Sequence, residues 1–245
     1  MERKDFLRSS LGFLSIGTLA VNCNKTTDVP ATTTDSTTTT GGTTSSGTCT
    51  VTDTDTEGPY PTHSPSSFVR QDIRDGQAGV TQTINITVKN VNNSCAVLSG
   101  AIVDIWHCSA LGYYSEYASN PGGGSYSSVD TTSLHFLRGR QTSDSNGLVS
   151  FTSIFPGWYS GRAPHIHVHI YSSNGNSLLV TQIALPEDVY NTVYTTAADY
   201  KTKGTPDTSN EKDSILSDSL DTELATVTGS ISAGYTLTHS ISVQG

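Results

Sequence analysis

Apolar and polar residues alternate along most of the chain from about residue 50 onward. Because successive side chains of a strand point to opposite faces, this period of two predicts half-buried strands at residues 83–88 and 235–243. Further strands are predicted at residues 100–106, 148–154, 165–171, 178–185 and 223–228. Turn sequences such as those at 144–147 and 172–175 separate them. The pattern predicts an all-β fold, a β-sandwich of about seven or more strands with long loops.

Helical periodicity is sparse. Residues 186–190 are expected to begin a short helix, with Pro186 at its first position and Glu187 and Asp188 in its first turn. Residues 194–221 are polar, and we expect an irregular surface excursion there with one helical turn.

The N-terminus has the composition of an export signal. Residues 1–8 are charged, and the apolar run at 11–21 is too short to cross a bilayer as a helix. Residues 1–22 are therefore expected to be an export signal, and Arg3-Lys4-x-Phe6-Leu7 resembles a twin-arginine signal whose second arginine is lysine. Cys23 follows where a lipoprotein carries its lipidated cysteine, although Asn22 replaces the usual small residue. Lipidation would attach the product to a membrane, whereas the alternative is a cleaved soluble protein; both are extracytoplasmic, in a bacterial periplasm or at the cell surface.

A linker separates this signal from the folded part. Residues 23–48 are dominated by Thr, Ser and Gly, which cannot bury enough apolar area to offset the entropy of ordering the chain. One folded domain is expected at residues 49–245. Without residues 1–22 the chain keeps 10 basic and 20 acidic residues, a net charge of −10. With no basic patch in the sequence, we expect no nucleic-acid partner.

Three cysteines lie beyond Cys23, namely Cys49, Cys95 and Cys108. An oxidising compartment permits one disulfide among them, and spacing alone leaves the pairing open. We expect Cys49 to pair with Cys95, because Cys108 lies close to the candidate metal region described next. Cys108 is then a small buried hydrophobe.

Alternating histidines provide the candidate chemistry. On a strand at 165–171, the side chains of His165, His167 and His169 share one face. Two neighbouring imidazoles can bind one metal ion, and Tyr159 adds a possible phenolate oxygen, a donor set suited to a transition metal such as iron. A zinc or copper site formed by the three histidines is the rival interpretation, and it lacks a general-base glutamate.

The order of several motifs resembles the intradiol ring-cleavage dioxygenases, the non-haem ferric enzymes typified by protocatechuate and catechol dioxygenases. The main likeness lies in Trp106-His-Cys108, Gly112-Tyr-Tyr-Ser115, Phe155-Pro-Gly-Trp-Tyr159 and Gly161-Arg-Ala-Pro-His-Ile-His167. It extends through Thr56-Glu-Gly-Pro-Tyr60, Arg70-Gln-Asp-Ile73, Phe136-Leu-Arg-Gly139, Thr142-x-Asp144-x-x-Gly147 and Thr181-Gln182.

The resemblance implies a ferric ion, Fe(3+), held by Tyr114, Tyr159, His165 and His167. Tyr113 is the alternative to Tyr114. His169 matches no ligand of the family, and a position further along the strand would carry it away from a shared ion.

The resemblance also assigns roles in catalysis and binding. Arg162 stabilises negative charge on the substrate, and Tyr159 is the ligand that leaves when the substrate binds. Tyr60, Trp158 and Gln182 are expected to bind substrate. Asp104 and His107 are expected to have structural roles.

The implied activity is cleavage of a catecholic ring between its two hydroxyl-bearing carbons with O2, giving a muconate-type diacid. Two departures from the family leave the particular catechol and the oligomeric state open. The loop from Tyr159 to Arg162 is short, and the Thr-rich stretch replaces the helical segment through which intracellular catechol dioxygenases dimerise. The alternative is an extracytoplasmic carbohydrate- or ligand-binding module without catalysis, which has no need of the Tyr, Tyr, His, His set.

Overall fold

The computed structural model describes residues 48–118 and 130–245. The predicted signal segment 1–22, Cys23 and all of the predicted linker except Thr48 lie outside the described residues. None of the helices in the described ranges is long and apolar enough to span a bilayer.

The first of two β-sheets contains both the first and the last strand of the fold. Its strands are β1 (Thr81–Asn90), β2 (Ala96–Val97), β5 (Leu148–Ile154), β8 (Thr226–Ser230) and β9 (Gly234–Val243). Their order is β2-β1-β9-β8, and β5 also pairs with β1. β1 and β9 run parallel, and the other pairs in this sheet are antiparallel.

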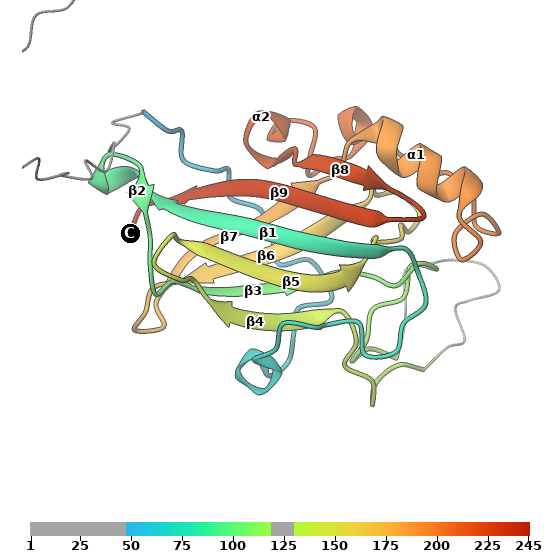
Figure 1. Ribbon diagram of the computed structural model, residues 1–245, viewed down its shortest axis with the longest axis horizontal. Coiled ribbons are helices and arrows are strands. Elements are labelled where there is room, and N and C mark those ends of the chain that lie inside the picture. Colours follow the sequence, from blue (N-terminus) through green and yellow to red (C-terminus); the bar gives the residue numbers. More distant parts are fainter. Residues whose placement is uncertain (1–47, 119–129) are drawn as a thin grey trace, which may run out of the picture. The chain divides into compact units, whose positions relative to one another are not determined.

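The second sheet is antiparallel and carries the histidine strand in its interior. It contains β3 (Ile102–Trp106), β4 (Arg138–Thr142), β6 (His165–Tyr171) and β7 (Ser177–Ala184), in the order β4-β3-β6-β7. The two sheets stack face to face (Figure 1). Ile166, Val168 and Ile170 of β6 join the buried core together with residues of β1 and β9, so the predicted β-sandwich is confirmed.

All seven predicted strands are present, with end residues that differ by up to three positions. The predicted helix is also present as α1 (Glu187–Thr196), although Pro186 caps it instead of forming its first residue. The start of the strand predicted at 223–228 was wrong, because residue 223 ends a short helix, α2 (Leu220–Glu223), and β8 begins only at Thr226. Strands β2 and β4 were not predicted.

Residues 194–221 are mostly irregular with short helical turns, as expected, but they are only in part a surface excursion. Tyr194, Tyr200 and Leu216 are almost completely buried. The Tyr194 hydroxyl donates to the Pro156 carbonyl (2.8 Å), and the Tyr200 hydroxyl donates to the Phe155 carbonyl (2.6 Å). The segment therefore packs against the chain that leads to Tyr159.

The predicted disulfide between Cys49 and Cys95 is confirmed. Cys108 is a free, buried thiol, as expected of a small hydrophobe.

Candidate metal centre and active site

The register of the second sheet places aromatic and polar side chains on both sides of His167. Trp106 of β3 and Gln182 of β7 lie directly opposite His167, so all three side chains share the sheet face that points away from the core. The Trp106 and His167 rings are stacked, with centroids 5.0 Å apart and planes 3° apart. The ring of His167 is thereby fixed on the sheet surface.

Two loops bring tyrosines to this face. The Tyr114 loop (residues 107–117) follows β3, and the ligand loop (residues 158–163) precedes β6. The backbone of Gly157, directly before the ligand loop, touches the Tyr114 loop, because a Cβ atom on Gly157 would collide with the carbonyl oxygens of Ser109 and Ala110. Only glycine permits so close an approach, and the contact sets the distance between the two tyrosine-bearing loops.

The four predicted metal donors come together. Nε2 of His165 lies 3.2 Å from Nε2 of His167 and 3.4 Å from each of the hydroxyl oxygens of Tyr114 and Tyr159. Donors that each lie about 2.0–2.2 Å from one ion are themselves roughly 3–3.5 Å apart. The two phenol oxygens and two imidazole nitrogens therefore fit a single transition-metal ion.

Hydrogen bonding directs the imidazole lone pair of His165 into the site. Nδ1 of His165 lies 2.7 Å from the Ala163 carbonyl oxygen, so it carries the proton and donates it, leaving Nε2 as an acceptor. A backbone partner of this kind orients metal-binding histidines in general.

Gly58 lies against the ring of His167, since a Cβ atom at residue 58 would come within 3.0 Å of its Cε1.

Burial controls the protonation of all four donors. It lowers the pKa of His165 to about 3 and that of His167 well below the usual value, so both imidazoles are neutral at pH 7. Burial raises the pKa of Tyr159 to about 12 and that of Tyr114 well above its ordinary range. The positive charge of Arg162 opposes the rise at both tyrosines. Without metal, the site therefore contains two neutral imidazoles and two neutral phenols.

Metal binding is expected to release about two protons per ion near pH 7, because both phenols must ionise whereas the histidines have no proton to lose. The apparent affinity should then rise by up to ~100-fold per pH unit below the phenol pKa values. Calorimetric titration with a ferric chelate, in two buffers of different ionisation enthalpy, counts the protons. Tyr159→Phe should release one proton fewer, and an affinity independent of pH would contradict phenolate coordination.

His169 lies on the same face but is engaged elsewhere. Its Nδ1 lies 2.9 Å from Oε1 of Glu57, and its Nε2 lies 2.8 Å from the Ser177 hydroxyl. Its ring stacks on Tyr171. The three-histidine zinc or copper site is therefore not formed by these side chains.

Asp104 and His107, which were expected to have structural roles, form hydrogen bonds within the fold. Arg140 donates two hydrogen bonds to Asp104, and His107 is bonded to the Cys108 carbonyl (2.8 Å) and the Ser153 hydroxyl (2.7 Å).

Arg162 lies beside the donors and is held from two sides. Its Nε donates to the Asp213 carboxylate (2.8 Å to Oδ2), and its Nη2 donates to Oε1 of Gln182 (2.6 Å). Asp213 is fully buried. The structure thus brings together two residues predicted for the site, Arg162 and Gln182, and adds Asp213, for which the sequence offered no pattern.

The remaining predicted residues, Tyr60 and Trp158, lie in different segments, before β1 and directly before Tyr159. The Tyr60 ring stacks on Tyr114, with centroids 4.9 Å apart. The indole Nε1 of Trp158 donates to the Gly204 carbonyl (2.8 Å), and Lys203 lies over the ring. Tyr60 therefore contacts a metal donor directly. The indole N–H of Trp158 is instead used in the hydrogen bond to Gly204.

A buried arginine of the unpredicted strand β4 supports the Tyr114 loop. Arg138 is 1% exposed and donates to the carbonyl oxygens of Ser115 (2.6 Å) and Tyr60 (3.0 Å). It also pairs with Glu116 at 3.5 Å. The motif that contains Arg138 contributed to the resemblance, but nothing in its local sequence indicated this supporting role.

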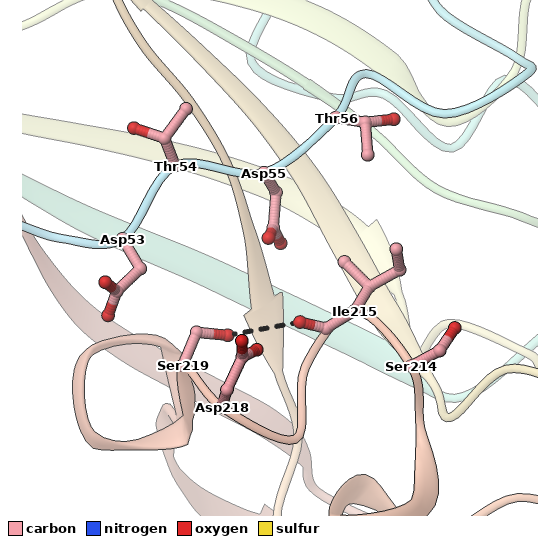
Figure 2. Close-up of a pocket in the computed structure, with 8 residues that line it drawn as sticks. All are labelled: Asp53, Thr54, Asp55, Thr56, Ser214, Ile215, Asp218 and Ser219. Atoms are coloured by element: carbon pink, nitrogen blue, oxygen red, sulfur yellow. Dashed lines mark hydrogen bonds between the residues drawn. The ribbon is translucent and has the colours of Figure 1, made fainter.

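A cavity of about 440 Å³ lies between two segments that lead into the site. One wall is formed by residues 53–56, just before Gly58, and the other contains Ser214 and Ile215, directly after Asp213. Figure 2 shows the carboxylates of Asp55 and Asp218 pointing into the space between these walls. None of the metal donors lines the cavity. Burial, and then the nearby Glu223, raise the pKa of the Asp55 carboxyl.

Comparison with known proteins identifies the family. A family model described as Dioxygenase matches residues 56–217. No protein with a curated description matches the chain in sequence.

Three solved structures illustrate the likeness. An intradiol ring-cleavage dioxygenase from Tetranychus urticae is 26% identical, with a TM-score of 0.70 over 80% of this chain and 95% of that one. The dioxygenase domain of a carbohydrate-binding fusion protein from Streptomyces sp. SirexAA-E is 24% identical, with a TM-score of 0.56 over 79% and 97%. Hydroxyquinol 1,2-dioxygenase from Pseudomonas putida DLL-E4 shares the fold at 16% identity, with a TM-score of 0.55 over 79% and 66%.

The family match covers the ligand loop, the Tyr114 loop and His165 and His167 of β6, and the neighbouring structures share the sandwich that positions them. The chain therefore belongs to the dioxygenase family that includes the intradiol ring-cleavage enzymes.

Proposed function

We propose that this protein is a non-haem ferric dioxygenase that cleaves a catecholic ring between its two hydroxyl-bearing carbons with O2, giving a muconate-type diacid. The observation that carries the proposal is that the donor atoms of Tyr114, Tyr159 and His167 all lie 3.2–3.4 Å from Nε2 of His165. Two anionic oxygens favour the ferric state, and ferric iron withdraws electron density from a bound catecholate so that it can react with O2.

The chain's own residues supply binding and proton transfer. Tyr159 would accept, as a phenolate, a proton that a catechol hydroxyl loses on binding; burial raises the pKa of its metal-free phenol to about 12. Arg162, which is always charged, stabilises negative charge that develops on the ring. Tyr60, which stacks on Tyr114, and Gln182, which lies opposite His167 in the sheet, orient the substrate.

The proposal is tested with the iron-loaded protein and catechol, protocatechuate and hydroxyquinol as substrates. Tyrosinate coordination should give the protein a burgundy colour, and turnover should consume one O2 per ring and place both oxygen atoms in the diacid. Labelling with ¹⁸O2 and mass spectrometry measures this. A chain that stays colourless with iron would refute the metal assignment. Catechol binding without O2 uptake would instead favour the non-catalytic ligand-binding module.

A further inference from the structure

Residues 203–213 run along the ligand loop and contact almost every residue of it. The contacts follow the order of the chain: Lys203 and Gly204 to Trp158, Asp207 to Ser160 and Gly161, and Asp213 to Arg162 and Ala163. Each of these contacts is a hydrogen bond from or to a polar group of the 203–213 segment. Of its charged side chains, Asp213 is fully buried and Lys203 is half-buried.

Asp213 connects the segment to the guanidinium of Arg162. The carboxylate accepts hydrogen bonds from Arg162 Nε, from the Ala163 backbone N–H (2.6 Å) and from the Ile215 backbone N–H (2.9 Å). Because Gln182 holds Nη2 of the same guanidinium, both the position and the plane of the group are fixed. Arg162 is then held facing Tyr114 and Tyr159, whose phenol pKa values its charge lowers.

Lys203 connects the two tyrosine-bearing loops. Its Nζ donates to the carbonyl oxygen of Leu111 (2.7 Å) in the Tyr114 loop and to that of Trp158, the residue before Tyr159. The ammonium also lies 4.7 Å from the centroid of the Trp158 ring. Burying an ammonium costs free energy, and here two carbonyl oxygens from different loops offset that cost.

We propose that the 203–213 segment positions the active site, with Asp213 orienting Arg162 and Lys203 fixing the spacing of the loops that carry Tyr114 and Tyr159. Both residues act through others and neither contacts the substrate. The effect of Asp213 on turnover rests on the proposed ring cleavage. The effect of Lys203 on metal binding rests only on the proposed iron site and not on ring cleavage.

The Asp213 assignment is tested by a double-mutant cycle in the full, iron-loaded chain. Asp213→Asn should lower kcat by about 10–100-fold with little change in KM, because the amide would present a donor to the guanidinium and displace it. In an Arg162→Met background, Asp213→Asn should have almost no further effect, since the group it orients is gone. Asp199→Asn, which changes an exposed carboxylate outside the 203–213 segment, is the matched control and should leave kcat unchanged.

The Lys203 assignment is tested by metal content and the visible absorption spectrum. Lys203→Met keeps the apolar stem and removes the two hydrogen bonds. We expect iron affinity to fall about 10-fold, the scale of supporting residues in metal sites, and the tyrosinate band to shift. Lys201→Met, an exposed lysine two residues earlier, should behave as wild type.

The outcomes separate this inference from the proposed function. An active wild-type protein in which Asp213→Asn lowers kcat equally with and without Arg162 would overturn the role of Asp213. Unchanged iron affinity and absorption in Lys203→Met would overturn the role of Lys203. A wild-type chain that binds iron but does not cleave catechols would refute the proposed function, and the Lys203 prediction would still be decided by its spectrum.

Discussion

Replacing His167 by alanine is expected to lower iron affinity by at least ~100-fold and to abolish ring cleavage. The side chain supplies one of four donors, and its Nε2 lies 3.2 Å from that of His165. Without this donor the metal is bound less tightly. The remaining binding free energy then does not cover the cost of ionising Tyr114 and Tyr159, whose charged forms burial already disfavours. Iron per chain after reconstitution, together with the intensity of the visible band, measures the effect.

His169→Ala is the matched control. It removes the same imidazole from the same strand and the same face, two residues further on. Because His169 is bonded to Glu57 and Ser177, its loss should leave the iron content intact. Loss of iron in His169→Ala with retention in His167→Ala would show that the histidine pair had been chosen wrongly.

The strands of the sandwich could be predicted from the sequence wherever one face of a strand is apolar and the other is polar. Strand β1 shows this, with Ile84, Ile86 and Val88 in the core. Strand β4 was missed because the face that it shares with Trp106 carries two arginines, and Arg138 and Arg140 pair there with Glu116 and Asp104. Hydrophobic periodicity cannot reveal a strand whose alternating residues are paired charges.

The same limit explains the 203–213 segment. Asp213 and Lys203 look like surface residues in the sequence, and their partners lie 51 and 92 residues away along the chain. Burial of such groups depends on partners that the tertiary fold supplies, and no local spacing encodes them. The histidine pair was predictable for the opposite reason, because strand alternation alone places His165 and His167 on one face. The tyrosines came from the resemblance to a family and not from any period.

Tyr159→Phe is expected to shift the visible absorption band and to slow turnover roughly 10–100-fold, while the protein keeps part of its iron. The substitution removes only a hydroxyl, and the ring can retain its edge contacts with Tyr114 and His165. Three donors remain for the metal, but the oxygen that accepts the substrate proton is gone. Absorption spectroscopy of the iron-loaded variant, with kcat measured on the best substrate, tests this.

Tyr113→Phe decides between the two neighbouring tyrosines of the Tyr114 loop. It also removes one hydroxyl, but Tyr113 packs into the main core, whereas Tyr114 packs with Tyr159 and Trp106. The absorption band of Tyr113→Phe should therefore match that of the wild type. A shift there would make Tyr113 the first phenolate ligand in place of Tyr114. Identical spectra for Tyr159→Phe and the wild type would remove Tyr159 from the ligand set, and with it the proton acceptor on which the proposed substrate binding depends.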